Sequence, residues 1–279
     1  MKKIYGSWLG NYPIFKQLYY MHDKIIKLIY KNDIIRKIKY KNICFNIKFN
    51  LNDGFVSKEL FMKKIYEEEI TSIFYDEVRE EDAVIDIGAN IWYFSLLSSK
   101  IVWNLGKVYA FEPSIDNFKK LEKNIQINSI SNTDLLNFWL WNNNEQLEIN
   151  VDPTNIWHNS LVKDLKGWKK ESIEVKTFDS LLDSWYIKNF EKIKLIKIDV
   201  EWFEFEVLLG MKRFLKSYRW IIILEFSPIF YWKKTNDFID FIYNNKFISH
   251  KINSNWSTTE IDLYQENIKS QVNILLKRV

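Results

Sequence analysis

The sequence predicts an α/β fold in which a mostly parallel sheet is covered by helices on both faces. From residue 81 onward, short apolar segments alternate with segments whose apolar residues recur at helical spacing. The apolar segments are nearly continuous, as in strands that are buried on both faces. Acidic residues or glycine directly follow several of them, at the place where an α/β sheet binds its ligands.

We predict two parts of the chain, an N-terminal extension of helix and β-hairpin at residues 1–80 and a main domain at residues 81–279. Residues 24–38 are predicted to form a basic amphipathic helix, because isoleucines and leucines fall near one face with lysines between them. This helix would cap the main domain or, alternatively, make a peripheral contact with a membrane. Residues 46–51 alternate like a strand.

The main domain is predicted to contain seven sheet strands, separated mostly by helices. The strands are expected at residues 83–87, 107–112, 135–140, 195–200, 221–226, 246–251 and 271–277. Helices are expected at residues 91–101, 116–128, 203–215 and 235–245. The polar stretch 150–170, between two further candidate strands, is expected to be a loop over the strand ends.

Composition limits the class of protein. Hydrophobic residues make up 47% of the chain, enough for a full globular core. The net charge of +4 is too small an excess to indicate a nucleic-acid partner. The single cysteine, Cys44, excludes an internal disulfide and a cysteine-based zinc cluster. Neither a secretory signal nor an apolar run long enough for a transmembrane helix is visible, so we expect a cytoplasmic protein, and we assign no metal.

Two turns carry the residue types of a nucleoside-binding site. After the first strand of the main domain stands Asp86-Ile-Gly88-Ala89-Asn90, and Glu112-Pro113 ends the next strand. A glycine turn before a helix brings backbone N–H groups close to an anionic ligand, and an acid at the spacing of Glu112 commonly binds ribose hydroxyls. The alternatives are a structural turn and a helix-capping acid. The turn lacks the three-glycine pattern of dinucleotide sites.

A third segment, Ile196-Lys-Ile-Asp-Val-Glu-Trp-Phe-Glu204, gives the combination its specificity. Together with Asp86 to Asn90, Phe111 to Pro113 and the Thr-Phe-Asp-Ser-Leu stretch from Thr177, it resembles the FkbM family of methyltransferases. The resemblance extends over residues 67–247. It implies a class I, Rossmann-like methyltransferase fold that uses S-adenosylmethionine (SAM). The implied reaction is O-methylation of a sugar, a glycan or a small hydroxylated metabolite.

The resemblance also implies roles for particular residues. The predicted SAM-binding residues follow the first two strands of the main domain, and they are Asp86, Gly88, Ala89, Asn90, Trp92, Glu112 and Pro113. Asp199 and Glu201 would be acids that face the reacting centre. His158, in the loop over the strand ends, is a further candidate for the general base, although a histidine in such a loop is more often a surface residue.

Trp92 and Trp202 stand where the family has glycine. The chain contains only 7 glycines but 12 tryptophans, and Trp103, Trp139, Trp141 and Trp157 also occur in contexts typical of turns. The chain is rich in Lys, Asn, Ile, Tyr and Phe, whose codons are rich in A and T. We therefore hypothesise an AT-rich genome in which UGA encodes glycine. Some tryptophans would then be glycines. The alternative is a non-catalytic binding module with a filled cofactor loop.

Overall fold

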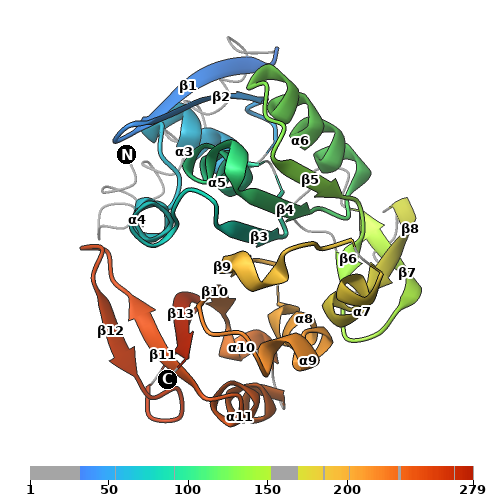
Figure 1. The fold of residues 1–279 in the computed structure, drawn as a ribbon, viewed down its shortest axis with the longest axis vertical. Helices are drawn as coiled ribbons and strands as arrows, with labels where there is room; N and C mark the ends of the chain where they lie inside the picture. The colour runs from blue at the N-terminus through green and yellow to red at the C-terminus, as the bar shows by residue number, and fades with distance from the viewer. Residues whose placement is uncertain are drawn as a thin grey trace, which may run out of the picture.

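The computed structural model describes residues 32–53, 55–90, 92–151, 169–184, 186–200, 202–231, 234–266 and 268–278 (Figure 1). Several predicted features lie outside these ranges. They are most of the predicted N-terminal helix, the central part of the 150–170 loop with Trp157 and His158, and Glu201.

The centre of the molecule is an eight-stranded sheet with the order β12-β11-β13-β10-β9-β3-β4-β5. From β10 to β5 neighbouring strands are parallel, whereas β13, β11 and β12 extend the sheet in antiparallel fashion. This confirms the predicted mostly parallel sheet, with one strand beyond the predicted seven. The strands are β3 (Ala83–Ile87), β4 (Lys107–Phe111), β5 (Thr133–Leu136), β9 (Ile193–Ile198), β10 (Ile221–Phe226), β11 (Phe247–Ile252), β12 (Thr258–Ile261) and β13 (Val272–Arg278).

Helices cover both faces of this sheet, and successive strand residues belong to different cores. Val84 packs in the core formed with α3 (Phe55–Lys63), α4 (Glu68–Glu77), α5 (Tyr93–Ile101) and α6 (Ile115–Ile127). Ile85 packs in the opposite core. That core is formed with α7 (Phe178–Asp183), α8 (Glu204–Gly210), α9 (Lys212–Leu215), α10 (Pro228–Tyr231) and α11 (Thr235–Asn244). Burial on both faces explains why the strand sequences are nearly continuous apolar runs.

The predicted helix at residues 24–38 is wrong over its last turns. Residues Ile34–Tyr40 form strand β1, which pairs with β2 (Ile43–Phe49) in an antiparallel hairpin. In this segment the apolar residues fit both a helical and an alternating pattern, and pairing with β2 selects the strand. The hairpin docks on α6 through Asn124 and Asn128, whose side-chain amides exchange hydrogen bonds of 2.7–2.9 Å with the β2 backbone. A boundary at residue 80 stays a prediction.

The predicted strand 135–140 is divided between two sheets. Its first part belongs to β5, and Trp139–Leu140 form β6, which joins β7 (Glu145–Val151) and β8 (Lys169–Lys176) in a separate three-stranded sheet. Asn137 stands between the two and donates to the carbonyls of Glu112 and Pro113, at 2.8 and 3.0 Å. This side chain turns the strand away from the main sheet. In the described part of the chain, no helix is long and apolar enough to cross a membrane.

Candidate active site

The predicted SAM-binding turns and Asp199 meet at one edge of the sheet. β3, β4 and β9 are parallel neighbours, so the turns after them lie side by side. Asp199 donates its backbone N–H to Ile87 O at 3.0 Å, and Gly88 and Ala89 donate theirs to Phe111 O at 3.0 and 2.9 Å. The three turns therefore form one hydrogen-bonded unit at the carboxyl ends of the strands, where α/β sheets bind ligands.

Gly88 is required by the neighbouring turn. Its φ is +76°, and a Cβ atom at this position would lie 1.9 Å from the backbone oxygen of Asp199. A side chain would thus separate the turn after β3 from the turn after β9. Close approach between two parts of the protein, more than close approach of a cofactor, accounts for the glycine.

Glu112 fixes the turn after β3 to the end of β4. Its Oε2 accepts a hydrogen bond from the Asn90 N–H at 2.8 Å, and its Oε1 accepts one from the Ser114 N–H at 2.9 Å. The residue is only 4% exposed. Burial raises the pKa of Glu112 to about 7, against the lowering effect of these hydrogen bonds. The Asn117 side chain forms a third hydrogen bond to the carboxylate, which leaves one of its roughly four acceptor positions for a hydroxyl donor.

Asp86 lies beneath this turn rather than in it. Its buried carboxylate accepts a hydrogen bond of 2.6 Å from Ser95 Oγ near the start of α5. Burial raises the pKa of Asp86, whereas Lys197 and Ser95 oppose that rise. Lys197 is the residue directly across from Asp86 in the pairing of β3 with β9. Asp86 therefore connects the first turn with the strand that carries Asp199.

Lys197 and Glu204 are functional candidates that sequence reasoning left without a role. Lys197 Nζ donates to Asp199 Oδ2 at 2.7 Å. Glu204 Oε1 accepts from the backbone N–H groups of Val200 and Trp202 at 3.2 and 3.3 Å, and its Oε2 accepts from Tyr231 Oη at 2.7 Å. Glu204 thus holds the turn after β9 as Glu112 holds the turn after β3. The sequence feature that could have identified Lys197 is its position between two isoleucines in a predicted buried strand.

Among the residues that the structure describes, four tryptophans occupy backbone conformations that favour glycine. Trp92, Trp103, Trp202 and Trp256 have φ values of +88°, +51°, +80° and +67°. Trp92 is 1% exposed, and its indole N–H is buried without a hydrogen-bond acceptor. The pattern supports the glycine hypothesis at positions 92, 103 and 202. Trp139 lies in β6, so the expectation of a turn at this position is wrong; Trp141 directly follows β6, and neither residue has the positive φ that favours glycine.

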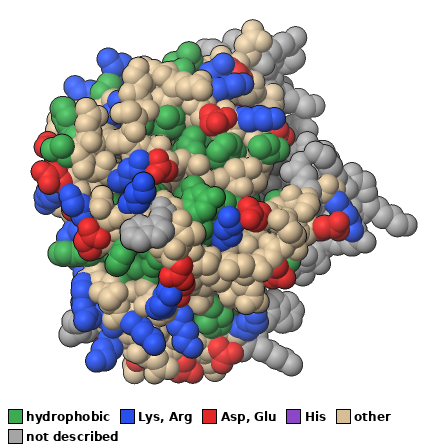
Figure 2. Space-filling view, turned by 45° about the vertical axis from the view of Figure 1, so that its right-hand side comes forward, with side chains coloured by type: hydrophobic (Ala, Val, Ile, Leu, Met, Phe, Trp, Pro, Cys, Tyr) green, Lys and Arg blue, Asp and Glu red, His purple; other side chains and the backbone are tan. Residues whose placement is uncertain are grey.

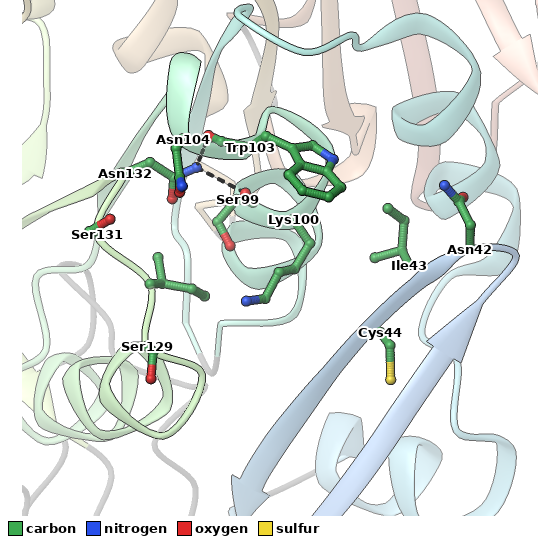
Figure 3. A pocket seen from close by; sticks show the side chains of 11 residues that line it. Asn42, Ile43, Cys44, Ser99, Lys100, Trp103, Asn104, Ser129, Ser131 and Asn132 are labelled. Atoms are coloured by element: carbon green, nitrogen blue, oxygen red, sulfur yellow. Dashed lines mark hydrogen bonds between the residues drawn. The ribbon is translucent and has the colours of Figure 1, made fainter.

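The pocket in Figure 3 lies at the other edge of the sheet, between the β1–β2 hairpin and the segments that precede β4 and β5. It has a volume of about 370 Å³ and a lining of mixed polarity, which includes Asn42, Cys44, Lys100 and Trp103. The predicted site residues do not line it. The pocket is therefore separate from the candidate active site.

The turn after β3 retains a polar atom suited to a cofactor. Asn90 Oδ1 is buried without a hydrogen-bond partner, which is a costly state unless a donor such as an ammonium or hydroxyl group reaches it. The neighbouring Glu112 carboxylate faces the same turn through the Asn90 N–H. These acceptors fit the ammonium and ribose hydroxyl groups of SAM. Within the described ranges, no group of three or more His, Cys, Asp and Glu side chains could hold a metal ion.

Comparison with protein families gives a match to the methyltransferase FkbM domain over residues 86–249. The chain belongs to this family. The predicted resemblance is confirmed, and SAM is the cofactor of the domain. The FkbM match begins at Asp86 and includes Glu112, Lys197, Asp199 and Glu204.

The chain is similar in sequence to several proteins named as methyltransferases. Hexuronic acid methyltransferase AglP from Haloferax volcanii is 29% identical over 160 residues, which cover 56% of this chain and 61% of AglP. Methyltransferase 1 from Beauveria bassiana is 23% identical over 175 residues, or 56% of this chain and 66% of that protein. The matches thus span less than two thirds of either relative. The FkbM methyltransferase structure from Methylobacillus flagellatus has a TM-score of 0.45 at 12% identity, over 74% of this chain and 50% of that one.

Proposed function

We propose that this protein transfers the methyl group of SAM to a hydroxyl oxygen of a sugar, with a uronic-acid-containing glycan as the first candidate acceptor. The similarity to the hexuronic acid methyltransferase AglP supports the sugar class. The observation that carries the proposal is Asp199, a half-buried acid of the FkbM domain at the end of β9, one turn away from the cofactor turn.

The charge at this edge favours a hydroxyl over a carboxylate as the acceptor group. Asp199 and Glu225 stand at the ends of the adjacent strands β9 and β10, and Glu67 contributes a third carboxyl nearby. These acids would repel an acceptor carboxylate placed at the reacting position. They can instead accept a hydrogen bond from a hydroxyl group, which orients its oxygen and draws off its proton.

Bound SAM supplies an electrophilic methyl group on a sulfonium, and the protein's own residues supply position and proton transfer. We propose that Glu112 and Asn90 orient the cofactor and that Gly88, Ala89, Trp92 and Pro113 form the turns around it, while Asp86 supports the first turn from beneath. Asp199 would accept the proton of the acceptor hydroxyl as its oxygen bonds to the methyl carbon and the carbon–sulfur bond breaks. Alignment of these three atoms accounts for most of the expected rate gain. Glu201 and His158, outside the described residues, stay candidates for the same proton.

A second candidate function is binding without catalysis. It is favoured by Trp92 and Trp202, which stand at two family glycine positions with φ values of +88° and +80°. If both are genuine tryptophans, the cofactor turn is obstructed and the domain would act as a binding module. On the face shown in Figure 2, acidic side chains stand among the basic ones.

The test combines cofactor binding with a choice of acceptors. Purified protein is titrated with SAM by calorimetry and then incubated with isotope-labelled SAM and matched glycans that carry either hexuronic acid or neutral hexose. Transfer of label to a base-stable ether on the uronate glycan would support the proposal. Label in a base-labile methyl ester would show carboxyl methylation and overturn the hydroxyl assignment. SAM binding without transfer to any sugar would favour the binding module.

A further inference from the structure

Lys197 is a buried cation near the carboxyl end of strand β9. It is 4% exposed, and its neighbours Ile196 and Ile198 in β9 are fully buried. An ammonium in such a place is unfavourable by several kcal/mol unless acidic partners surround it. The position therefore calls for an explanation that hydrophobic packing does not give.

The acidic partners of Lys197 come from three different elements. Asp199 follows the same strand and accepts its hydrogen bond at 2.7 Å, and Asp86 lies directly across in β3. Glu67, the residue directly before α4, provides the third carboxyl group that interacts electrostatically with Lys197. Burial opposes the charged form, but Asp199, Asp86 and Glu67 together raise the pKa of Lys197, so the ammonium stays charged. The ring of Phe94 in α5 lies 4.9 Å from Nζ.

Lys197 and Asp199 differ in their access to solvent. The Lys197 side chain is 5% exposed, whereas the Asp199 side chain is 30% exposed. The ammonium thus contacts Asp199 from inside the protein and leaves part of the carboxylate open at the edge of the sheet. This arrangement is suited to holding a carboxylate in one orientation, and it leaves the lysine itself away from any ligand.

Glu67 completes the group from outside the family match, which begins at residue 86. It has a left-handed backbone conformation with φ +39°, and its Oε2 is buried without a hydrogen-bond partner. Burial raises the pKa of Glu67 to about 7, although Lys197 lowers it. The buried Tyr66 hydroxyl lies near the same carboxyls, because burial and the charges of Glu67, Asp199 and Glu225 raise its pKa. With three carboxyls around one ammonium, Glu67 is thus able to take up a proton near neutral pH while Asp199 keeps its contact with Lys197.

We propose that Lys197 is a positioning residue of the methyl-transfer site, which holds the Asp199 carboxylate toward the acceptor and connects it through Asp86 to the cofactor turn. The proposal rests on the proposed function, which gives Asp199 the acceptor proton. Lys197 itself touches neither substrate. Its removal should therefore reduce turnover by loss of Asp199 orientation, with little effect on SAM binding.

The experiment uses Lys197→Met, which keeps an unbranched side chain only one heavy atom shorter and removes its charge. Lys107→Met is the matched control, because Lys107 forms a 2.7 Å pair with Asp134 at the opposite edge of the sheet. The first measurement is the carboxyl carbon NMR signal of Asp199, assigned with Asp199→Asn. We expect Lys197→Met to move this signal and Lys107→Met to leave it in place. An unmoved Asp199 signal would overturn the positioning role.

The second measurement separates binding from turnover, in this chain and in one with glycine at positions 92 and 202. Lys197→Met should lower kcat by at least about tenfold, the lower range for loss of an acid–base group, and leave the SAM Kd within about threefold. A kcat equal to that of Lys107→Met would overturn the proposal. If Lys197→Met does not fold, Glu67→Gln/Lys197→Met restores charge balance and is measured in its place. A moved Asp199 signal without sugar methylation by the parent protein would refute only the proposed function.

Discussion

Trp256 provides a test of the glycine hypothesis that is independent of the active site. It lies in the turn between β11 and β12, where its N–H donates to Asn253 O at 2.9 Å and its φ is +67°. The last position of such hairpin turns is commonly a left-handed glycine. The indole is 56% exposed, so its removal leaves no large cavity in the core.

Trp256→Gly should therefore stabilise the protein or leave its stability unchanged. Relief of the left-handed conformation contributes about 1–2 kcal/mol, and the greater freedom of glycine in the unfolded chain removes about 0.4–1 kcal/mol. The control is Trp220→Gly, at a position that is 45% exposed and lacks a positive φ. At that position no left-handed strain is relieved, so the entropic cost of glycine in the unfolded chain is uncompensated. The contact of Lys194 Nζ with the indole ring at 3.7 Å, worth about 0.5–1 kcal/mol, is also lost.

The assay is thermal and urea unfolding of the parent and the two variants at one pH. We expect the variants to differ by about 2 kcal/mol, equivalent to about 4–8 °C in Tm for a chain of this size. If Trp256→Gly destabilises the protein as much as Trp220→Gly does, the backbone argument is refuted. The gene gives a second check, because UGG codons at positions 92, 202 and 256 would exclude recoded UGA and leave the binding-module alternative.

Four further predictions concern the site. Trp92→Gly/Trp202→Gly should tighten SAM binding about a hundredfold, and equal affinities by calorimetry would contradict the steric argument. Glu112→Ala should weaken SAM binding at least about tenfold, since two backbone N–H groups lose their shared acceptor; unchanged affinity would remove Glu112 from the cofactor site. Asp199→Asn should reduce turnover more than SAM affinity. Loss of SAM binding in a folded variant would place Asp199 on the cofactor side of the site and not on the acceptor side. Burial raises the pKa of Glu204 from 4.5 to about 7. Between these two pH values the folded protein therefore binds more protons than the unfolded chain, and it loses stability as the pH rises. Glu204→Gln should reduce the fall in Tm between pH 5.5 and pH 8, and an unaltered fall would contradict this assignment.

The sequence determined the parallel sheet and the place of the candidate site. Strands buried on both faces need nearly continuous apolar residues, and β3, β4, β9 and β10 all lie within a few residues of their predicted bounds. Glu112 and Asp199 were found for the same reason, since polar residues directly after such strands have to gather at one edge. The family match confirms the motif on which the cofactor prediction rested.

The tertiary structure decided what depends on contacts between distant segments. The residues of β1 fitted a helix until pairing with β2 fixed them as a strand, and Asn137 directed the chain out of the main sheet. Gly88 is explained by the Asp199 carbonyl 1.9 Å from a Cβ placed on it. The partners of Lys197 come from positions 67, 86 and 199. Local periodicity reports which face of an element is buried, whereas the partner of a buried charge is set by how the elements pack against one another.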